Sequence, residues 1–145
     1  MNVIYRSLIT LLMLHSISAF SAESFWPTAK EWLEIRGVIQ SQLDAFQQDD
    51  DAAAYALAAP SVKQRFPTAE AFSKMVRNLY TPIYNLREVK FLTPSIVHGR
   101  IMQGVQFLSD ENQVFLAVFT VEKQEDKSWK IKACELMPVE SKTAT

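Results

Sequence analysis

Apolar residues recur at helical spacing early in the chain. The first stripe steps by three and four residues and consists of Trp32, Ile35, Ile39, Leu43 and Phe46. Such spacing lies on one face of an α-helix. Thr28 can cap this helix, and Glu31 three positions later completes a capping box. The pattern predicts an amphipathic helix that begins near residue 29 and ends at a run of aspartates.

The run of aspartates, Asp49 to Asp51, separates this helix from an alanine-rich segment. Residues 52–59 are strong helix formers and predict a short helix, which Pro60 is expected to end. An aspartate before such a run is a good N-cap, so Asp50 or Asp51 is expected to cap a short helix. A calcium loop would need oxygen ligands at alternating positions around a glycine turn, and the segment lacks that spacing. We interpret the three acids as a joint between helices.

A further helical stripe follows Thr68, which is another good N-cap. Its members are Phe72, Met75, Val76, Leu79 and Tyr80. Thr81-Pro82 ends the pattern, because proline cannot continue a helix. We interpret the stripe as part of the core rather than as contacts to a cofactor.

From Leu86 onward the apolar period changes to two, which is typical of strands. The predicted strands are residues 86–93, 96–108, 113–124 and 128–137. Short polar turns join them and favour antiparallel pairing. Gly99 and Gly104 fall inside the second predicted strand, where glycine often marks a bulge or a bend. The sequence therefore predicts an α+β fold, with N-terminal helices packed on a strongly curved four-stranded antiparallel sheet.

Strand parity predicts which side chains share a face of the sheet. In the last strand Trp129, Ile131 and Ala133 share one face. The other face carries Lys130, Lys132 and Cys134. The third strand, residues 114–121, is apolar on both faces and is expected at the centre of the sheet. Its outer face would then be covered by a second copy of the chain, in a homodimer.

The N-terminus has the layout of a secretory signal peptide. A start with one positive charge, Arg6, precedes an apolar run over residues 8–14 and then small residues. Cleavage after Ser21 would place Ala19 and Ser21 at the two small-residue positions. The run is shorter than the roughly 20 residues of a transmembrane helix, although an uncleaved anchor or a buried first helix are alternatives. We predict a signal peptide (1–21), a mature lead (22–28), a single domain (29–138) and a flexible tail (139–145).

Composition and charge narrow the class of protein. The chain has 145 residues, 48% of them hydrophobic, and a formal charge of −1, which suits one globular domain. Its mixed charges form no basic patch for nucleic acid. Cys134 is the only cysteine, so no intramolecular disulfide can form in an oxidising compartment. The expected location is the periplasm, with no membrane span after processing.

Three segments resemble a known bacterial family. They are VIQSQLDAFQQDDDAAAYALAAPSVKQRF, FSKMVRNLYTPIY and SWKIKACELMP, within residues 34–138. They are similar to the family called domain of unknown function 4864. The order of helices and strands also resembles the cone-shaped, cystatin-like fold of nuclear-transport-factor-2-like domains. Lys127-Ser128 stands where the family has a glycine before Trp129. The resemblance implies the cone fold and assigns no catalytic residue.

The open end of such a cone is the place where a ligand would enter. The candidate pocket-lining residues are Tyr80, Tyr84, Gln103, Trp129 and Glu135. Aromatic walls with a few polar groups are typical of pockets for small apolar molecules. The same residues also fit an ordinary core with polar edges, so both interpretations stay open at the level of sequence.

Reactive side chains are few. His98 is expected to share a strand face with Arg100, and the sequence marks no acid as its partner. Cys134 would be nucleophilic only if neighbouring lysines lowered its pKa, and a small, partly buried side chain is the alternative. No metal-binding or cofactor motif appears. The sequence predicts an extracytoplasmic module that binds a small molecule or a protein. The alternative is a cone-fold enzyme acting on a small apolar substrate, with Glu135 or His98 as acid or base.

The signal peptide makes a direct prediction about the exported protein. Its mature N-terminus should lie between Ala22 and Ser24, because cleavage near Ser21 fits the small-residue rule. Mass spectrometry of the protein recovered from the periplasm checks this. An intact Met1 in a cytosolic fraction would contradict it.

Overall fold

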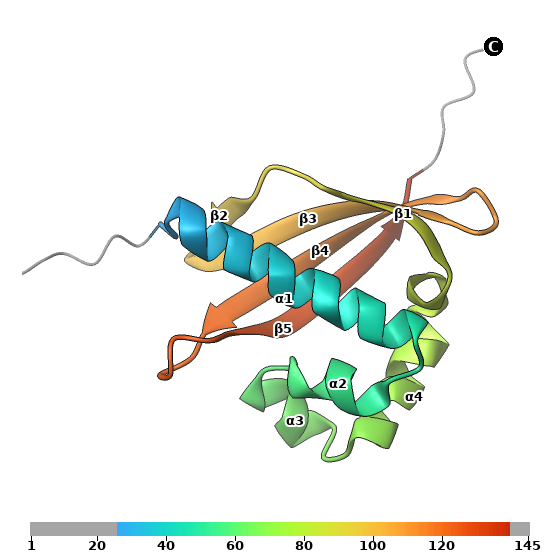
Figure 1. Ribbon diagram of the computed structural model, residues 1–145, viewed down its shortest axis with the longest axis horizontal. Coiled ribbons are helices and arrows are strands. Elements are labelled where there is room, and N and C mark those ends of the chain that lie inside the picture. Colours follow the sequence, from blue (N-terminus) through green and yellow to red (C-terminus); the bar gives the residue numbers. More distant parts are fainter. Residues whose placement is uncertain (1–25, 140–145) are drawn as a thin grey trace, which may run out of the picture.

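The long helix begins with the predicted capping box. In the computed structural model, which describes residues 26–139, the Thr28 hydroxyl accepts a hydrogen bond from the Glu31 N–H (3.3 Å). The Glu31 carboxylate in turn accepts from the Thr28 N–H (2.8 Å). Helix α1 (Ala29–Gln47) follows and crosses one face of the sheet (Figure 1). The predicted signal peptide, most of the lead and the tail after residue 139 lie outside the described residues.

Three shorter helices and a 3₁₀ turn follow α1. They are α2 (Asp51–Ala56), α3 (Pro60–Arg65), α4 (Ala69–Leu79) and η1 (Thr81–Tyr84). Asp50 caps α2 by accepting the Ala53 N–H (3.0 Å), and Thr68 caps α4 by accepting the Ala71 N–H (3.1 Å). The prediction that Pro60 ends a helix over residues 52–59 is wrong, because α2 already ends at Ala56 and Pro60 is the first residue of α3. Proline fits that position, where the missing N–H has no helical partner to lose.

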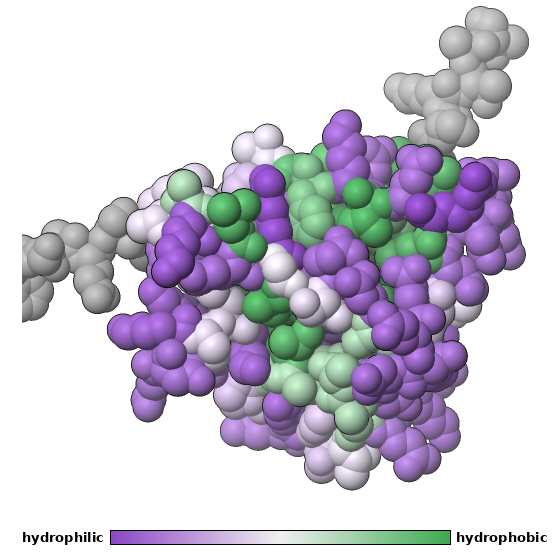
Figure 2. All heavy atoms as spheres, viewed as in Figure 1, coloured by the Kyte–Doolittle hydropathy of each residue, from purple (hydrophilic) through white to green (hydrophobic). Residues whose placement is uncertain are grey.

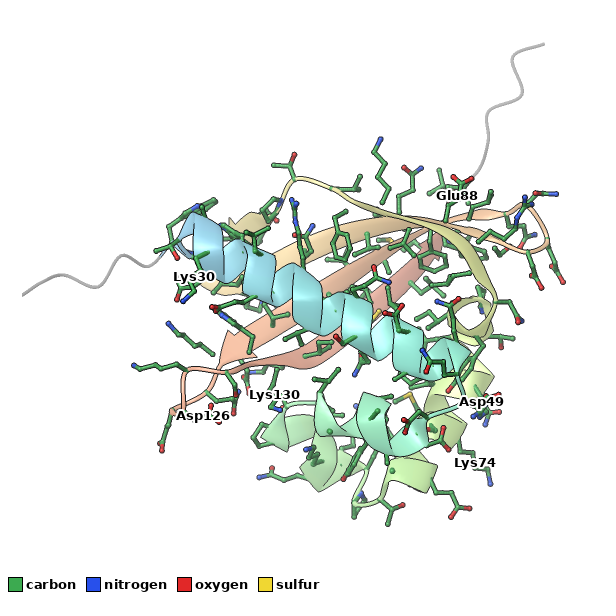
Figure 3. All side chains as sticks on the ribbon, viewed as in Figure 1. Lys30, Asp49, Lys74, Glu88, Asp126 and Lys130 are labelled. Atoms are coloured by element: carbon green, nitrogen blue, oxygen red, sulfur yellow. The ribbon has the colours of Figure 1, made fainter. Side chains whose placement is uncertain are left out.

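The three aspartates form the expected joint between α1 and α2. Arg77 of α4 contacts the carboxylates of Asp49 (2.8 Å) and Asp51 (3.1 Å). Its guanidinium also lies over the ring of Tyr84, 4.4 Å from the ring centroid. Figure 3 shows Asp49 at the end of α1, beside α4. The acids therefore cap α2 and link the joint to α4.

The strands form one antiparallel sheet, as predicted. They are β1 (Leu86–Phe91), β2 (Ser95–Val97), β3 (Arg100–Ser109), β4 (Val114–Lys123) and β5 (Trp129–Pro138). The order is β1-β3-β4-β5, and β2 pairs with β3 beyond the end of β1. All pairings are antiparallel. The α+β class is confirmed.

The sheet has five strands because the second predicted strand is divided. His98 and Gly99 both have positive φ (48° and 76°), and Val97 pairs with Arg100 across them. Two such residues make a tight hairpin turn. The expectation that His98 lies within a strand and shares a face with Arg100 is therefore wrong.

The sheet is open and curves less than predicted, with β1 and β5 at opposite edges (Figure 1). Gly104 does not bend it into a closed cone. A Cβ at Gly104 would lie 3.4 Å from Cδ1 of Leu92, so the glycine lets the β1–β2 connection approach closely.

One extra residue in β5 changes the predicted strand parity. Thr120 pairs with Ala133 and Val121 pairs with Ile131, so Lys132 is left over as a β-bulge. After the bulge Cys134 pairs with the buried Phe119 and faces the helices, whereas Ala133 is exposed. The predictions that Ala133 faces the core and that Cys134 shares a face with the lysines are wrong for this reason.

The core lies between the sheet and the helices. Phe72 of α4 and Trp129 of β5 both belong to it, as do Ile35, Ile39 and Leu43 of α1. Phe72 contacts the rings of Phe46, Tyr55 and Phe66. Leu79 is the exception in the α4 stripe, because 68% of it is exposed.

We predict that Phe72→Ala lowers the free energy of unfolding by about 3–5 kcal/mol, because it leaves a cavity among aromatic rings. Urea denaturation measures this. Leu33→Ala on α1, where the leucine is 68% exposed, is the control and should change stability by less than about 0.5 kcal/mol. An unchanged midpoint for Phe72→Ala would show that the α4 stripe is not core.

Candidate functional site

The backbone of the edge strand β5 is hydrogen-bonded to the helical layer at Ile131. The Ile131 N–H donates to the Leu57 carbonyl (2.9 Å), and the Ala59 N–H donates to the Ile131 carbonyl (2.8 Å). Lys130 adds a hydrogen bond from its Nζ to the Ala56 carbonyl (2.9 Å). Figure 3 shows Lys130 between β5 and this segment. The α2–α3 connection therefore covers the sheet edge at Ile131.

A cleft of about 550 Å³ opens beyond these hydrogen bonds, between α3, α4 and β5. Its walls are mainly apolar and aromatic. The helices contribute Val62, Phe66, Phe72, Met75, Val76 and Leu79, and the sheet contributes Phe119, Ile131 and Cys134. Figure 2 shows hydrophobic residues in the middle of the helical face, surrounded by hydrophilic ones. The volume and lining are those of a small-molecule site.

Tyr80 closes one side of the cleft. It follows α4, and its hydroxyl donates to the Cys134 carbonyl (3.0 Å), which joins the helix end to β5. Burial raises the pKa of Tyr80, the nearby Glu135 carboxylate raises it further, and Arg65 lowers it. The hydroxyl therefore stays protonated at neutral pH and lies within the field of both Arg65 and Glu135.

The cleft also has polar and charged lining residues. Gln42 is only 4% exposed, and its Nε2 donates to the Ala54 carbonyl (3.1 Å). The charged lining residues are Arg65, Arg100, Lys132 and Glu135. All four are exposed. Arg65 lies at the end of α3 on the helical side, whereas the register places Arg100 and Glu135 on the outer face of the sheet, around the edge of the cleft.

Cys134 is a structural thiol in this fold. Its side chain faces the helices, and burial raises its pKa to about 12, with a further contribution from Glu135. A thiol with so high a pKa carries almost no thiolate at neutral pH. The interpretation of Cys134 as a buried small side chain is favoured over that of a nucleophile.

The structure brings two of the five predicted pocket residues to the cleft, Tyr80 and Glu135. Tyr84 instead packs against Phe46, with 5.4 Å between ring centroids. Gln103 is fully buried and donates from Nε2 to the carbonyls of Leu92 (2.7 Å) and Gly104 (2.8 Å). It thereby holds the β1–β2 connection.

Trp129 and His98 also lie away from the cleft lining. Trp129 is buried, with the Lys123 ammonium 5.8 Å from its ring centroid. His98 is exposed in the β2–β3 turn. The proposed acid–base residues His98 and Glu135 therefore do not both line the cleft.

Sequence reasoning missed the contribution of α3. Val62 and Phe66 are four residues apart, and both line the cleft together with Arg65. Their spacing is a helical signal, but it is short and follows a proline. A shallower hollow of about 370 Å³ lies nearby, lined by Ala58, Pro60, Lys63, Gln64, Gln124 and Lys130. It has no aromatic lining residue, which makes the larger cleft the better candidate.

Residues 26–139 offer neither a metal site nor a membrane-spanning helix. No three His, Cys, Asp or Glu side chains in this range lie together as a metal site would require. No helix in the same range combines the length and apolarity needed to cross a membrane.

The fold and the cleft define an α+β domain in which one antiparallel sheet carries helices on one face and a ligand-sized cleft at its edge. Over residues 28–144 the chain matches the family described as Domain of unknown function (DUF4864). The chain belongs to this family, which confirms the resemblance seen in the sequence. Neither the curated proteins nor the solved structures include a match, so no structural neighbour supports the likeness to nuclear-transport-factor-2-like domains.

Proposed function

We propose that this protein binds a small molecule with an apolar body in the cleft between α3, α4 and β5. The main evidence for this proposal is the cleft itself, which is about 550 Å³ in volume and is lined by aromatic and aliphatic side chains. Sites of this size and composition hold small ligands, and a few polar groups orient them. Tyr80 and Gln42 supply neutral polar groups, and the charged residues lie at the mouth.

The hydrogen bonds along β5 favour a small molecule over an extended peptide. A peptide would bind by adding a strand to the free sheet edge. The N–H and carbonyl of Ile131 are already bonded to the α2–α3 connection, and the Cys134 carbonyl already accepts from Tyr80. Three backbone groups that a peptide would use beside the cleft are therefore already bonded within the protein.

Binding is favoured over turnover by the position of the reactive groups. Glu135 is exposed at the mouth, no histidine is among the described lining residues, and the Cys134 thiol has a raised pKa. General acid–base catalysis needs a positioned proton donor or acceptor near the reacting atoms. The enzyme alternative would rest on Glu135 alone. The predicted signal peptide places this binding activity outside the cytoplasm, and that part of the proposal rests on the sequence.

A matched pair of leucines tests the cleft. Leu79 lines it and Leu33 on α1 does not, yet both are 68% exposed on helices. We predict that Leu79→Lys weakens binding of the neutral fluorescent probe N-phenyl-1-naphthylamine about tenfold, because roughly 1.4 kcal/mol of apolar contact is lost. Leu33→Lys should leave the fluorescence titration unchanged. Equal binding by both variants would place the probe elsewhere.

A second proposal concerns the face of the sheet opposite α1. Register and parity put six large apolar residues on this outer face: Met102, Leu108, Val114, Leu116, Val118 and Met137. Charges of both signs surround them, including Glu88, Lys90 and Glu135. An apolar centre with a mixed charged rim suits self-association through a symmetric interface. We propose that two copies of the chain form a dimer through this face.

Light scattering on the mature protein tests the dimer. We expect twice the monomer mass, and a monomer for Leu116→Lys, because the substitution places a charge in the apolar centre of the interface. Leu33→Lys on the helical face should remain dimeric. A strictly monomeric mass of the unaltered protein at high concentration would remove the proposal.

A further inference from the structure

The charges at the mouth of the cleft are unbalanced. Its lining includes three cations, Arg65, Arg100 and Lys132, and one carboxylate, Glu135. Lys132 is paired with Glu122 (3.0 Å). Over the described residues, neither arginine forms an ion pair with a carboxylate. Arg100 has the strand parity of the outer sheet face, so Arg65 is the guanidinium that lies on the helical side of the cleft without a carboxylate partner among the described residues.

Arg65 is placed where it can act on a bound molecule. Its guanidinium lies over the ring of Phe66, 5.6 Å from the ring centroid, and Phe66 is itself a wall of the cleft. A ligand seated against Phe66 would therefore have a cation beside it.

We propose that the ligand is a free single-chain amphiphile with a carboxylate head. The head binds at the mouth to Arg65, and the chain lies along Phe66, Phe72 and Met75. A guanidinium matches a carboxylate through two parallel hydrogen bonds, which a neutral hydroxyl cannot reproduce. Glu135 also lines the cleft, but its strand position faces the outer side of the sheet. This inference rests on the proposed function and adds the charge of the ligand to it.

Matched twelve-carbon probes separate the charge from the chain. Isothermal titration at low salt, below the micelle concentration of each probe, compares dodecanoate, dodecanol and dodecyltrimethylammonium. We expect dodecanoate to bind at least about tenfold more tightly than dodecanol, and the cationic probe to bind most weakly. Shortening the carboxylate to ten carbons should weaken binding by up to about fourfold per lost methylene.

Arginine variants test whether the preference for dodecanoate over dodecanol arises at the mouth of the cleft. The variant Arg65→Gln should lose the preference for dodecanoate while it keeps its affinity for dodecanol. Arg87→Gln is the control, because Arg87 is exposed and bonds to Asn112, and it is not among the lining residues. Thermal unfolding confirms that each variant is folded. A preference that survives the Arg65→Gln substitution would overturn the assignment.

The remaining outcomes also distinguish the two proposals. Equal affinity for dodecanoate and dodecanol would overturn the carboxylate inference and leave the apolar cleft intact. Binding of none of the probes would remove both. Vesicles that contain anionic phospholipid provide a separate arm, because a membrane lipid headgroup offers a similar anion. Sedimentation of the protein with those vesicles, without binding of free dodecanoate, would overturn the assignment to a free amphiphile.

Discussion

The β-bulge at Lys132 is the constraint on which the rest of the site depends. Before it, Ile131 faces the core and its backbone is bonded to the α2–α3 connection. After it, Cys134 faces the helices and its carbonyl meets Tyr80. A regular strand would turn Cys134 to the outer face instead, since side chains alternate. The extra residue thus allows the helical layer to form hydrogen bonds with β5 at two places, Ile131 and Cys134. The cleft lies between these two places.

The same arrangement explains why the cleft is apolar inside and charged outside. Helices α3 and α4 direct Val62, Phe66, Phe72 and Val76 toward the sheet, where they join the core. The same side chains also line the cleft, which separates these helices from part of β5. The charged side chains come from the end of α3 and from the exposed positions of β3 and β5. The edge groups that might attract another strand are used within the fold, which is one way in which proteins protect a sheet edge. The outer sheet face, by contrast, carries no described helix (Figure 1).

Local signals in the sequence predicted the local structure well. The capping box at Thr28 and Glu31, the Asp50 cap and the antiparallel strands each depend on neighbouring residues, and all are present. What the sequence could not supply depends on distant contacts. His98-Gly99 is a weaker turn signal than Asn-Gly, and the bulge is visible only once the register with β4 is known. One wall of the cleft comes from α3, a helix that the sequence pattern did not predict, and only Tyr80 and Glu135 of the predicted pocket residues line the cleft.

The central claim is that the cleft between α3, α4 and β5 receives an apolar ligand. The most direct measurement is a nitrogen–proton correlation spectrum of the labelled protein, titrated with N-phenyl-1-naphthylamine. The account predicts that amide shifts concentrate in α3, in the second half of α4 and in residues 131–136, and that the β3–β4 turn is unaffected. Shifts that concentrate on the outer-face positions of β3 and β4, or no shifts at a saturating probe concentration, would contradict it.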